Sequence, residues 1–234
     1  LKKLGFSEGI IEQFLRPFFA GIFLEEELET SSRMFEFVFK MFAEGNAMIP
    51  EEGMEAIPKQ LEQKLTQTTL RFNTKVSAID DTEITLANGE SIQADYVIVA
   101  TSLPQILALP HNEVAKWRSC ENLYFTAPRM VLKKPFIGLI GDESTLVNNI
   151  FYSSSLQETE TEGDFLLSVT VVKSHGYSEE QLIHQVEEEL REHCKIEGLN
   201  FLKLYTIKQA LPKLGTLKYS NDSSSIAVSD RVFL

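Results

Sequence analysis

The sequence predicts a protein of the α+β (mixed α/β) class, with helices and a mixed, largely antiparallel sheet. Apolar side chains recur every three to four positions in residues 7–19 and 178–194, which is the period of amphipathic helices. Residues 69–101 and 123–173 instead contain short runs rich in β-branched and aromatic residues, which are typical of strands. At 234 residues the chain is long enough for one large domain or two small ones.

Two helices are expected near the N-terminus. Ser7 is a suitable cap for the first, and Pro17 is expected to kink or end it. A serine or threonine at 30–32 caps the second, residues 33–44, and Gly45 stops it. Apolar residues surround most of this second helix, so it is predicted either to be a core helix, the default interpretation, or to line an apolar cavity.

The next segment changes from helix to strands. Asn88-Gly89 is the strongest hairpin signal in the chain. The run 96–100, Tyr-Val-Ile-Val-Ala, predicts a parallel strand buried on both faces. The other elements expected here are a short helix at 58–65 and strands at 69–72, 75–79, 83–87 and 91–94.

A second domain is expected to begin near residue 122, because longer strands follow. Ser178 and Gln181 form a capping-box pattern at the start of a helix that runs to about Cys194. The remaining predictions are a short helix or two at 103–117, and strands at 123–133, 136–141, 146–153, 165–173, 201–210 and 231–234.

Charge and composition exclude several kinds of partner. The formal charge is 22 minus 34, or −12, so nucleic acid is not expected to bind and anionic membrane surfaces are disfavoured. Cys120 and Cys194 are far apart and lack a ligand pattern, so we predict neither a disulfide nor a metal site, and a cytoplasmic setting. The apolar stretch 14–24 is about half the length of a membrane-spanning helix.

Short catalytic motifs do not identify a reaction. The sequence contains no GxGxxG, Walker, HExxH or GxSxG pattern. The acidic cluster 25–29 is interpreted as a solvated linker, and the four histidines as surface or loop residues. The catalytic residues are therefore unknown at this level.

An ordered series of segments carries a family resemblance. Residues 14–24 (FLRPFFAGIFL), 30–35 (TSSRMF), 45–50 (GNAMIP), 53–58 (GMEAIP) and 94–101 (ADYVIVAT) occur in the order and spacing of one family. The series resembles the middle of the flavin-containing amine oxidase superfamily, whose relatives include protoporphyrinogen oxidases and carotenoid desaturases. The resemblance implies an FAD-dependent oxidoreductase that transfers hydride from substrate to flavin.

The same resemblance implies a domain division. Residues 1–45 would be the helical part of a substrate-binding domain, 46–104 part of an FAD-binding α/β domain, 105–212 the rest of the substrate domain, and 213–234 a return toward the FAD domain. It implies FAD contacts at Val76, Ala100, Thr101 and Ser102. From the residues alone, Val76 would be an ordinary strand residue.

Three departures from the family pattern limit these implications. The family's N-terminal GxGxxG segment and its closing Ala-Gly-Asp are not in the sequence. The chain also starts inside a helical pattern with no Met, so it is expected to be an internal fragment that does not retain FAD and is inactive alone. A loose alignment places Ala127 where amine oxidases carry a lysine, so the resemblance does not by itself imply amine oxidation. The substrate implied by the family as a whole is apolar or an amine.

The apolar residues suggest where such a substrate would bind. The expected small-molecule contacts are Phe35, Val38, Phe39, Phe42, Met130, Phe151 and Tyr152. The alternative function is a non-catalytic binding domain whose apolar helices form a groove for a ligand or partner. A third hypothesis, association with a membrane surface through residues 14–23, is disfavoured by the acidic charge. Self-association of the fragment through exposed apolar surface is also expected.

Overall fold

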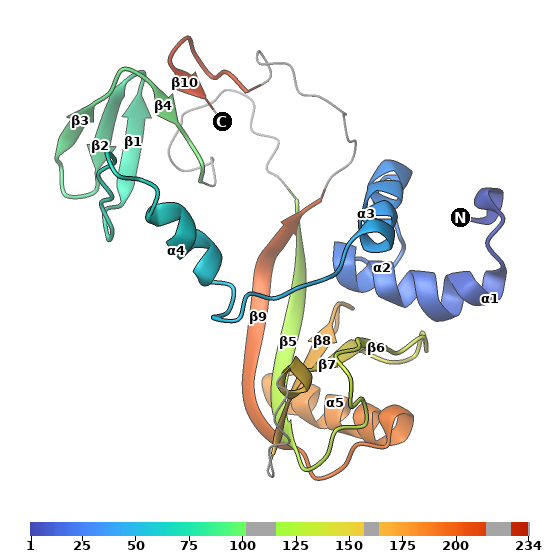
Figure 1. The fold of residues 1–234 in the computed structure, drawn as a ribbon. Helices are drawn as coiled ribbons and strands as arrows, with labels where there is room; N and C mark the ends of the chain where they lie inside the picture. The colour runs from blue at the N-terminus through green and yellow to red at the C-terminus, as the bar shows by residue number, and fades with distance from the viewer. Residues whose placement is uncertain (102–115, 157–163, 214–225, 234) are drawn as a thin grey trace. The chain divides into compact units, whose positions relative to one another are not determined.

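The computed structural model describes residues 1–101, 116–156, 164–213 and 226–233 (Figure 1). The chain divides into two compact units: unit 1 contains Leu1–Phe35 and Lys116–Gly215, and unit 2 contains Glu36–Ala115 and Thr216–Leu234. Both units combine helices with strands, and the main sheet is antiparallel. The predicted α+β class is therefore confirmed.

A five-stranded sheet forms the centre of unit 1. Its strand order is β6-β7-β8-β5-β9, and every pair of neighbours is antiparallel. In Figure 1 the two longest strands, β5 and β9, run side by side along one edge. The strands are β5 (Trp117–Ala127), β6 (Gly138–Leu139), β7 (Val147–Tyr152), β8 (Phe165–Val171) and β9 (Asn200–Pro212), and a short 3-10 helix, η4 (Ser153–Leu156), follows β7.

Helix α5 (Glu179–Cys194) covers one face of this sheet. Ser178 and Gln181 form the predicted capping box: the Ser178 side chain accepts from the Gln181 backbone N–H, and the Gln181 side chain accepts from the Ser178 backbone N–H. Alternate residues of the strands point toward the helix because side chains alternate between sheet faces. The main core consists of residues from β5, β7, β8 and α5, including Leu123, Phe125, Val169, Val186 and Leu190.

The helical start of unit 1 continues past Pro17 rather than ending there. After η1 (Lys2–Leu4), Ser7 caps α1 (Glu8–Ile10), and the chain then widens into a π-helical turn, η2 (Ile11–Leu15). Pro17 lies in the first turn of α2 (Arg16–Phe23), where its missing N–H is tolerated. Of the two alternatives predicted for Pro17, a kink or an end, the end is wrong. A π turn at Ile11–Leu15 directly precedes the helical turn that contains the proline.

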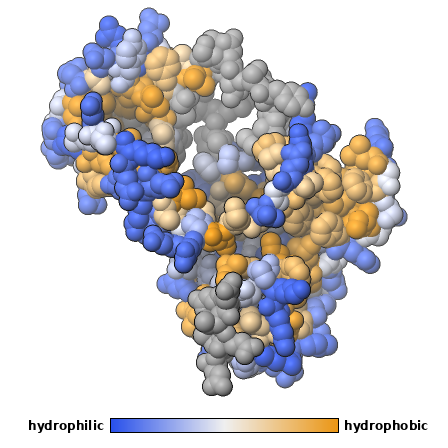
Figure 2. Space-filling view, viewed as in Figure 1, coloured by the Kyte–Doolittle hydropathy of each residue, from blue (hydrophilic) through white to orange (hydrophobic). Residues whose placement is uncertain are grey.

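Helix α3 (Ser32–Glu44) differs from the expectation of burial. None of its residues is buried, and Phe37, Met41 and Phe42 are exposed. In Figure 2, which has the same view as Figure 1, orange (hydrophobic) surface gathers over the N-terminal helices. The prediction of a core helix is therefore wrong for the described residues, because none of the α3 side chains is withdrawn from solvent as a core residue would be.

The described residues of unit 2 form two small sheets, helix α4 and the larger part of α3. Strands β1 (Val76–Asp80), β2 (Glu83–Leu86) and β3 (Ser91–Gln93) form an antiparallel sheet, and α4 (Ala56–Glu62) precedes it. The turn between β2 and β3 places Gly89 at φ 88°, which glycine adopts without strain. The strand predicted at 69–72 is absent, and residues 69–72 lie outside any helix or strand.

The predicted parallel strand is present but short. Strand β4 (Val97–Ile98) pairs in parallel with β10 (Val232–Phe233), residues far apart in the sequence. Val97, Val99 and Val232 form a small buried core, whereas Ile98 is exposed. The expectation of burial on both faces is therefore wrong for the described residues. The helix predicted at 103–117 lies mostly outside the described residues, and Trp117 belongs to β5.

Candidate functional site

Unit 2 contains a hollow of about 740 Å³. Its wall includes Val76 at the start of β1 and Ala100 and Thr101 after β4. These are three of the four residues for which the family resemblance implies FAD contacts. The fourth, Ser102, lies outside the described residues. The structure thus brings residues 24 or more positions apart to one concave surface, but the cofactor contact itself stays a prediction.

The hollow combines apolar walls with hydroxyl groups. Ile79, Ile84, Val97 and Val99 supply the apolar part of its lining, and Thr74, Ser77 and Thr101 supply hydroxyls. The Thr74 and Ser77 hydroxyls donate to the carbonyl oxygens of Phe72 and Thr85 at 2.9 and 3.0 Å. An apolar slot with a few polar groups suits a flat heteroaromatic ring such as adenine.

The hollow lacks the parts that bind a pyrophosphate. Lys75 is the single basic residue among its described lining residues. No glycine-rich turn leads into a helix N-terminus at this surface in the described lining, and the sequence has no GxGxxG. The residues present therefore fit the adenine end of FAD and do not fit its pyrophosphate.

The face of the unit 1 sheet opposite α5 carries two rows of polar and aromatic side chains. The strand register places each row across four neighbouring strands, from β9 through β5 and β8 to β7. One row is Tyr205, Asn122, Thr170 and Asn149, and the other is Lys203, Tyr124, Ser168 and Phe151. We call these eight residues the open face.

Hydrogen bonds order the middle of the open face. The Asn122 side-chain N–H donates to the Tyr124 hydroxyl at 2.9 Å, and the Ser168 hydroxyl donates to Asn122 Oδ1 at 3.1 Å. Asn149 donates to the Thr170 hydroxyl at 3.3 Å. Tyr124 and Tyr205 pack edge to face with ring centroids 5.9 Å apart. Apart from Lys203, the open face therefore presents neutral hydrogen-bonding groups between aromatic rings.

The residues predicted to contact substrate do not all lie on the open face. Phe151 belongs to it, but its neighbour Tyr152 points the opposite way into the core, and Met130 packs against that same core. Phe35 packs against Phe19, with ring centroids 4.8 Å apart. The remaining three, Val38, Phe39 and Phe42, lie on the part of α3 that belongs to unit 2.

Ala127, which aligns loosely with the lysine of amine oxidases, is fully buried. It belongs to the core cluster beneath α5 and not to the open face. The open face does carry one lysine, Lys203, whose Nζ lies 5.9 Å from the centroid of the Tyr205 ring. Motif reading did not identify the polar members of the open face, because they follow no short pattern. Alternation along β8 and the second half of β5 indicates which side chains share a face, but it does not indicate which strands lie side by side.

A second cavity, of about 260 Å³, lies in unit 1 between η2, α2 and the segment before β7. Its cations already have partners: Arg16 donates to Glu12 at 2.6 Å, and Lys173 donates to the carbonyl oxygens of Glu143 and Thr145. The side-chain amide of Asn148 donates to the Pro17 carbonyl at 3.1 Å. We therefore interpret this cavity as a packed ion-pair region and not as the functional site.

Three titratable groups of unit 1 are affected by burial. Burial raises the pKa of the Tyr152 phenol, and the nearby backbone of Val131 offsets the rise only in part. Burial likewise raises the pKa of the thiols of Cys120 and Cys194. Both cysteines are free. These groups stay protonated at neutral pH and provide no nucleophile or base.

The chain is thus an α+β protein of two units. Unit 2 carries the strand-lined hollow, and unit 1 carries the open face of its sheet. The model of the family described as flavin containing amine oxidoreductase matches residues 1–216. The chain therefore belongs to this family, as the ordered motif series predicted. Among curated protein sequences, none matches the chain.

Solved structures share this fold at low sequence identity. A reduced UDP-galactopyranose mutase aligns with a TM-score of 0.61 at 16% identity, covering 88% of this chain and 54% of that protein. An oxidoreductase from Methanosarcina mazei aligns with a TM-score of 0.63 at 16% identity, again covering 88% of this chain and 54% of that protein. A Pyrococcus furiosus protein aligns with a TM-score of 0.53 at 15% identity, covering 69% of this chain and 44% of that protein. The chain thus spans about half the length of these structures.

Proposed function

We propose that this chain is part of an FAD-dependent oxidoreductase that transfers hydride from an apolar or amine substrate to the flavin. The observation that carries the proposal is the unit 2 hollow, which gathers Val76 from the start of β1 and Ala100 and Thr101 from the segment after β4. In this proposal the hollow receives the adenine end of FAD. The flavin, when bound, supplies the electron-accepting chemistry.

The proposed substrate surface is the open face of unit 1. Tyr124, Tyr205 and Phe151 offer rings for stacking, and Asn122 and Ser168 offer neutral hydrogen-bonding groups. None of the eight residues of the open face is acidic. This favours an uncharged ring-containing substrate over a cationic amine, since a cation would lack a carboxylate partner there.

The proposed compartment is the cytoplasm, because both cysteines are free thiols. Among the described residues, no helix has the length and apolar character needed to cross a membrane. This chain alone is expected to be inactive, since the described lining of the hollow provides no pyrophosphate site.

The experiment that tests the proposal uses the longest natural product of the gene. We expect this protein to purify with the visible absorption bands of flavin. Val76→Glu should lower its flavin content by at least about tenfold, because an unpaired carboxylate in the hollow is costly to desolvate. Ala78→Glu is the matched control, since Ala78 is an exposed β1 residue outside the described lining.

Two outcomes would contradict the proposal. A long form that is colourless and takes up no added FAD would favour the non-catalytic binding domain. Equal loss of flavin in Val76→Glu and Ala78→Glu would show that β1 matters for folding alone, and would remove the hollow as the adenine site.

A further inference from the structure

An ion network lies in unit 1 around a carboxylate that water does not reach. The Glu25 side chain is 0% exposed and the Arg118 side chain 17% exposed. Glu25 Oε2 accepts from Arg118 Nη2 at 2.5 Å, and Glu25 Oε1 accepts from the backbone N–H of Thr30 at 2.9 Å. The buried charge is thus paired and hydrogen-bonded on both oxygens.

Glu29 extends the network to a third chain segment. Its Oε2 accepts from Arg118 Nη2 at 3.2 Å and from Lys213 Nζ at 2.6 Å. The hydrogen bond from Lys213 is the main reason that the pKa of Glu29 is lowered. The backbone N–H of Lys213 also donates to the carbonyl oxygen of Lys116 at 2.7 Å. We call Glu25, Glu29, Arg118 and Lys213 the ion clamp.

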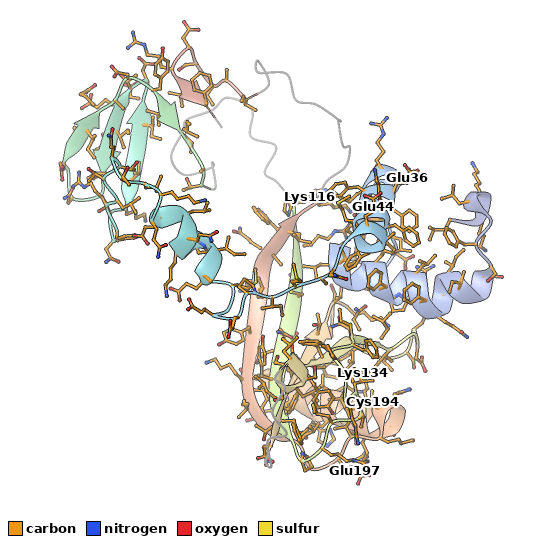
Figure 3. All side chains as sticks on the ribbon, viewed as in Figure 1. Glu36, Glu44, Lys116, Lys134, Cys194 and Glu197 are labelled. Atoms are coloured by element: carbon orange, nitrogen blue, oxygen red, sulfur yellow. The ribbon has the colours of Figure 1, made fainter. Side chains whose placement is uncertain are left out.

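The positions of these residues along the chain are the second observation. The chain passes between the two units at three places, after Phe35, before Lys116 and after Gly215. Glu25 and Glu29 lie shortly before the first of these, Arg118 two residues after Lys116, and Lys213 two residues before Gly215. Figure 3 labels Lys116, which lies beside the start of β5, where the chain enters unit 1. The clamp therefore links the chain beside two of the connections, at Arg118 and Lys213, to the loop that precedes the helix of the first connection.

The first connection is a helix and not a flexible linker. Helix α3 begins at Ser32 in unit 1 and continues past Phe35 into unit 2. The loop before it holds Leu24 and Leu28 at φ 53° and 51°, a left-handed conformation that is unfavourable for leucine. Such strain persists where surrounding contacts over-determine the backbone, and Glu25 and Glu29 make those contacts here.

We propose that the ion clamp is a hinge restraint that fixes the direction in which the three connections leave unit 1, and so limits movement of unit 2 relative to unit 1. The restraint depends on charge pairing, because one guanidinium and one ammonium hold two carboxylates from a single strained loop. It does not depend on the proposed function, since all four residues lie outside the hollow and the open face.

The test is a distance distribution between spin labels, one on each unit, in the whole chain. Labels at Glu192→Cys on α5 and Gln93→Cys on β3 lie at exposed positions, in a background of Cys120→Ala and Cys194→Ala. Lys213→Glu places a carboxylate against Glu29, and we expect it to broaden the distribution. Lys213→Arg keeps the charge and should leave the width unchanged.

A matched ion pair serves as the control. Lys213 and Glu29 are 42% and 51% exposed, and Arg71 and Glu90 in unit 2 are 43% and 46% exposed. Arg71→Glu should therefore leave the distribution as in the parent chain. Equal widths for Lys213→Glu and the parent chain would overturn the proposal, as would equal broadening by Arg71→Glu. Because Lys213 is exposed, unit 1 should stay folded in both Lys213 variants, and its cooperative urea unfolding verifies this.

Discussion

At the scale of single residues, Tyr152 and Tyr124 offer a matched pair of tests. The Tyr152 hydroxyl is buried and has no partner at hydrogen-bond geometry, although the nearby backbone of Val131 lowers its pKa, whereas the Tyr124 hydroxyl accepts from Asn122 at 2.9 Å. Tyr152→Phe should leave the free energy of unfolding unchanged or raise it by about 1 kcal/mol, because an unsatisfied polar group is removed. Tyr124→Phe should lower it by about 1 kcal/mol, since Asn122 loses a partner.

Urea unfolding of the two variants at neutral pH measures this difference. A large loss of stability in Tyr152→Phe would show that its hydroxyl has a partner that the geometry does not reveal. If Tyr152 instead contacts substrate, the same variant should alter substrate affinity while leaving stability intact. The measurement therefore also bears on the predicted role of this residue.

The thiol of Cys194 should make the unfolding free energy of unit 1 fall in the alkaline pH range. Burial raises the pKa of its thiol in the folded state, so the unfolded chain loses this proton first as the pH rises. The stability that it contributes is fully present below about pH 8.5 and is lost as the pH rises through the folded-state pKa. The difference in unfolding free energy between the parent chain and Cys194→Ala should therefore shrink from neutral to alkaline pH. A difference that is independent of pH would contradict this assignment.

At the scale of elements, the contact between α2 and β7 depends on a glycine. A Cβ atom at Gly21 would lie 2.7 Å from Asn148 Nδ2, whose bonds to Pro17 and Asn149 hold it in place. A Cβ atom at Gly9 in α1 would meet nothing within 4 Å. Gly21→Ala should cost about 1 kcal/mol net, because two hydrogen bonds of about 1 kcal/mol each outweigh the gain in helix propensity.

Gly9→Ala is the control and should stabilise the chain by about 0.5 kcal/mol, as expected for replacing a helical glycine in open space. Thermal and urea unfolding of the two variants would show opposite signs. If both variants stabilise, Asn148 moves aside without cost, and the close approach of α2 to β7 is not a constraint.

The elements also show what local sequence could predict. Ser178 with Gln181, and Asn88 with Gly89, encode their structures within four residues, and both predictions are confirmed. The failures depend on long-range context. Residues 69–72 have strand-like composition but are in no described strand. The apolar circumference of α3 could not reveal that none of its residues is buried. The open face depends on the register of four strands, which no local pattern specifies.

The candidate site residues likewise include some that the sequence placed together correctly and some that it did not. The motif series led to the family and to Val76, Ala100 and Thr101, which the structure places on one hollow. Composition led to Phe151 and Tyr152 as one surface, but adjacent strand residues point to opposite faces. Site residues chosen for apolar character alone therefore included core residues.

At the scale of the whole molecule, the two units should differ in stability. The main core of unit 1 contains 13 buried apolar residues from β5, β7, β8, α5 and the turn after α5, whereas the described core of unit 2 contains Val97, Val99 and Val232. Buried apolar area is the main favourable term in folding, so unit 2 should unfold at lower urea concentration. Hydrogen exchange across a urea series should show two cooperative transitions, with β1 to β3 exchanging first and β5, β8 and α5 last.

Substitutions in each core assign the two transitions. Leu190→Ala removes a fully buried α5 side chain and should destabilise the second transition by about 2–5 kcal/mol. Val97→Ala should shift the first transition alone, because its neighbours in the core belong to unit 2. If each substitution affects one transition only, the units fold independently. This is the result expected for substitutions that share no contacts. If either substitution shifts both transitions equally, the chain behaves as one cooperative body, and the connections joined by the ion clamp transmit stability between the units as well as restraining their movement.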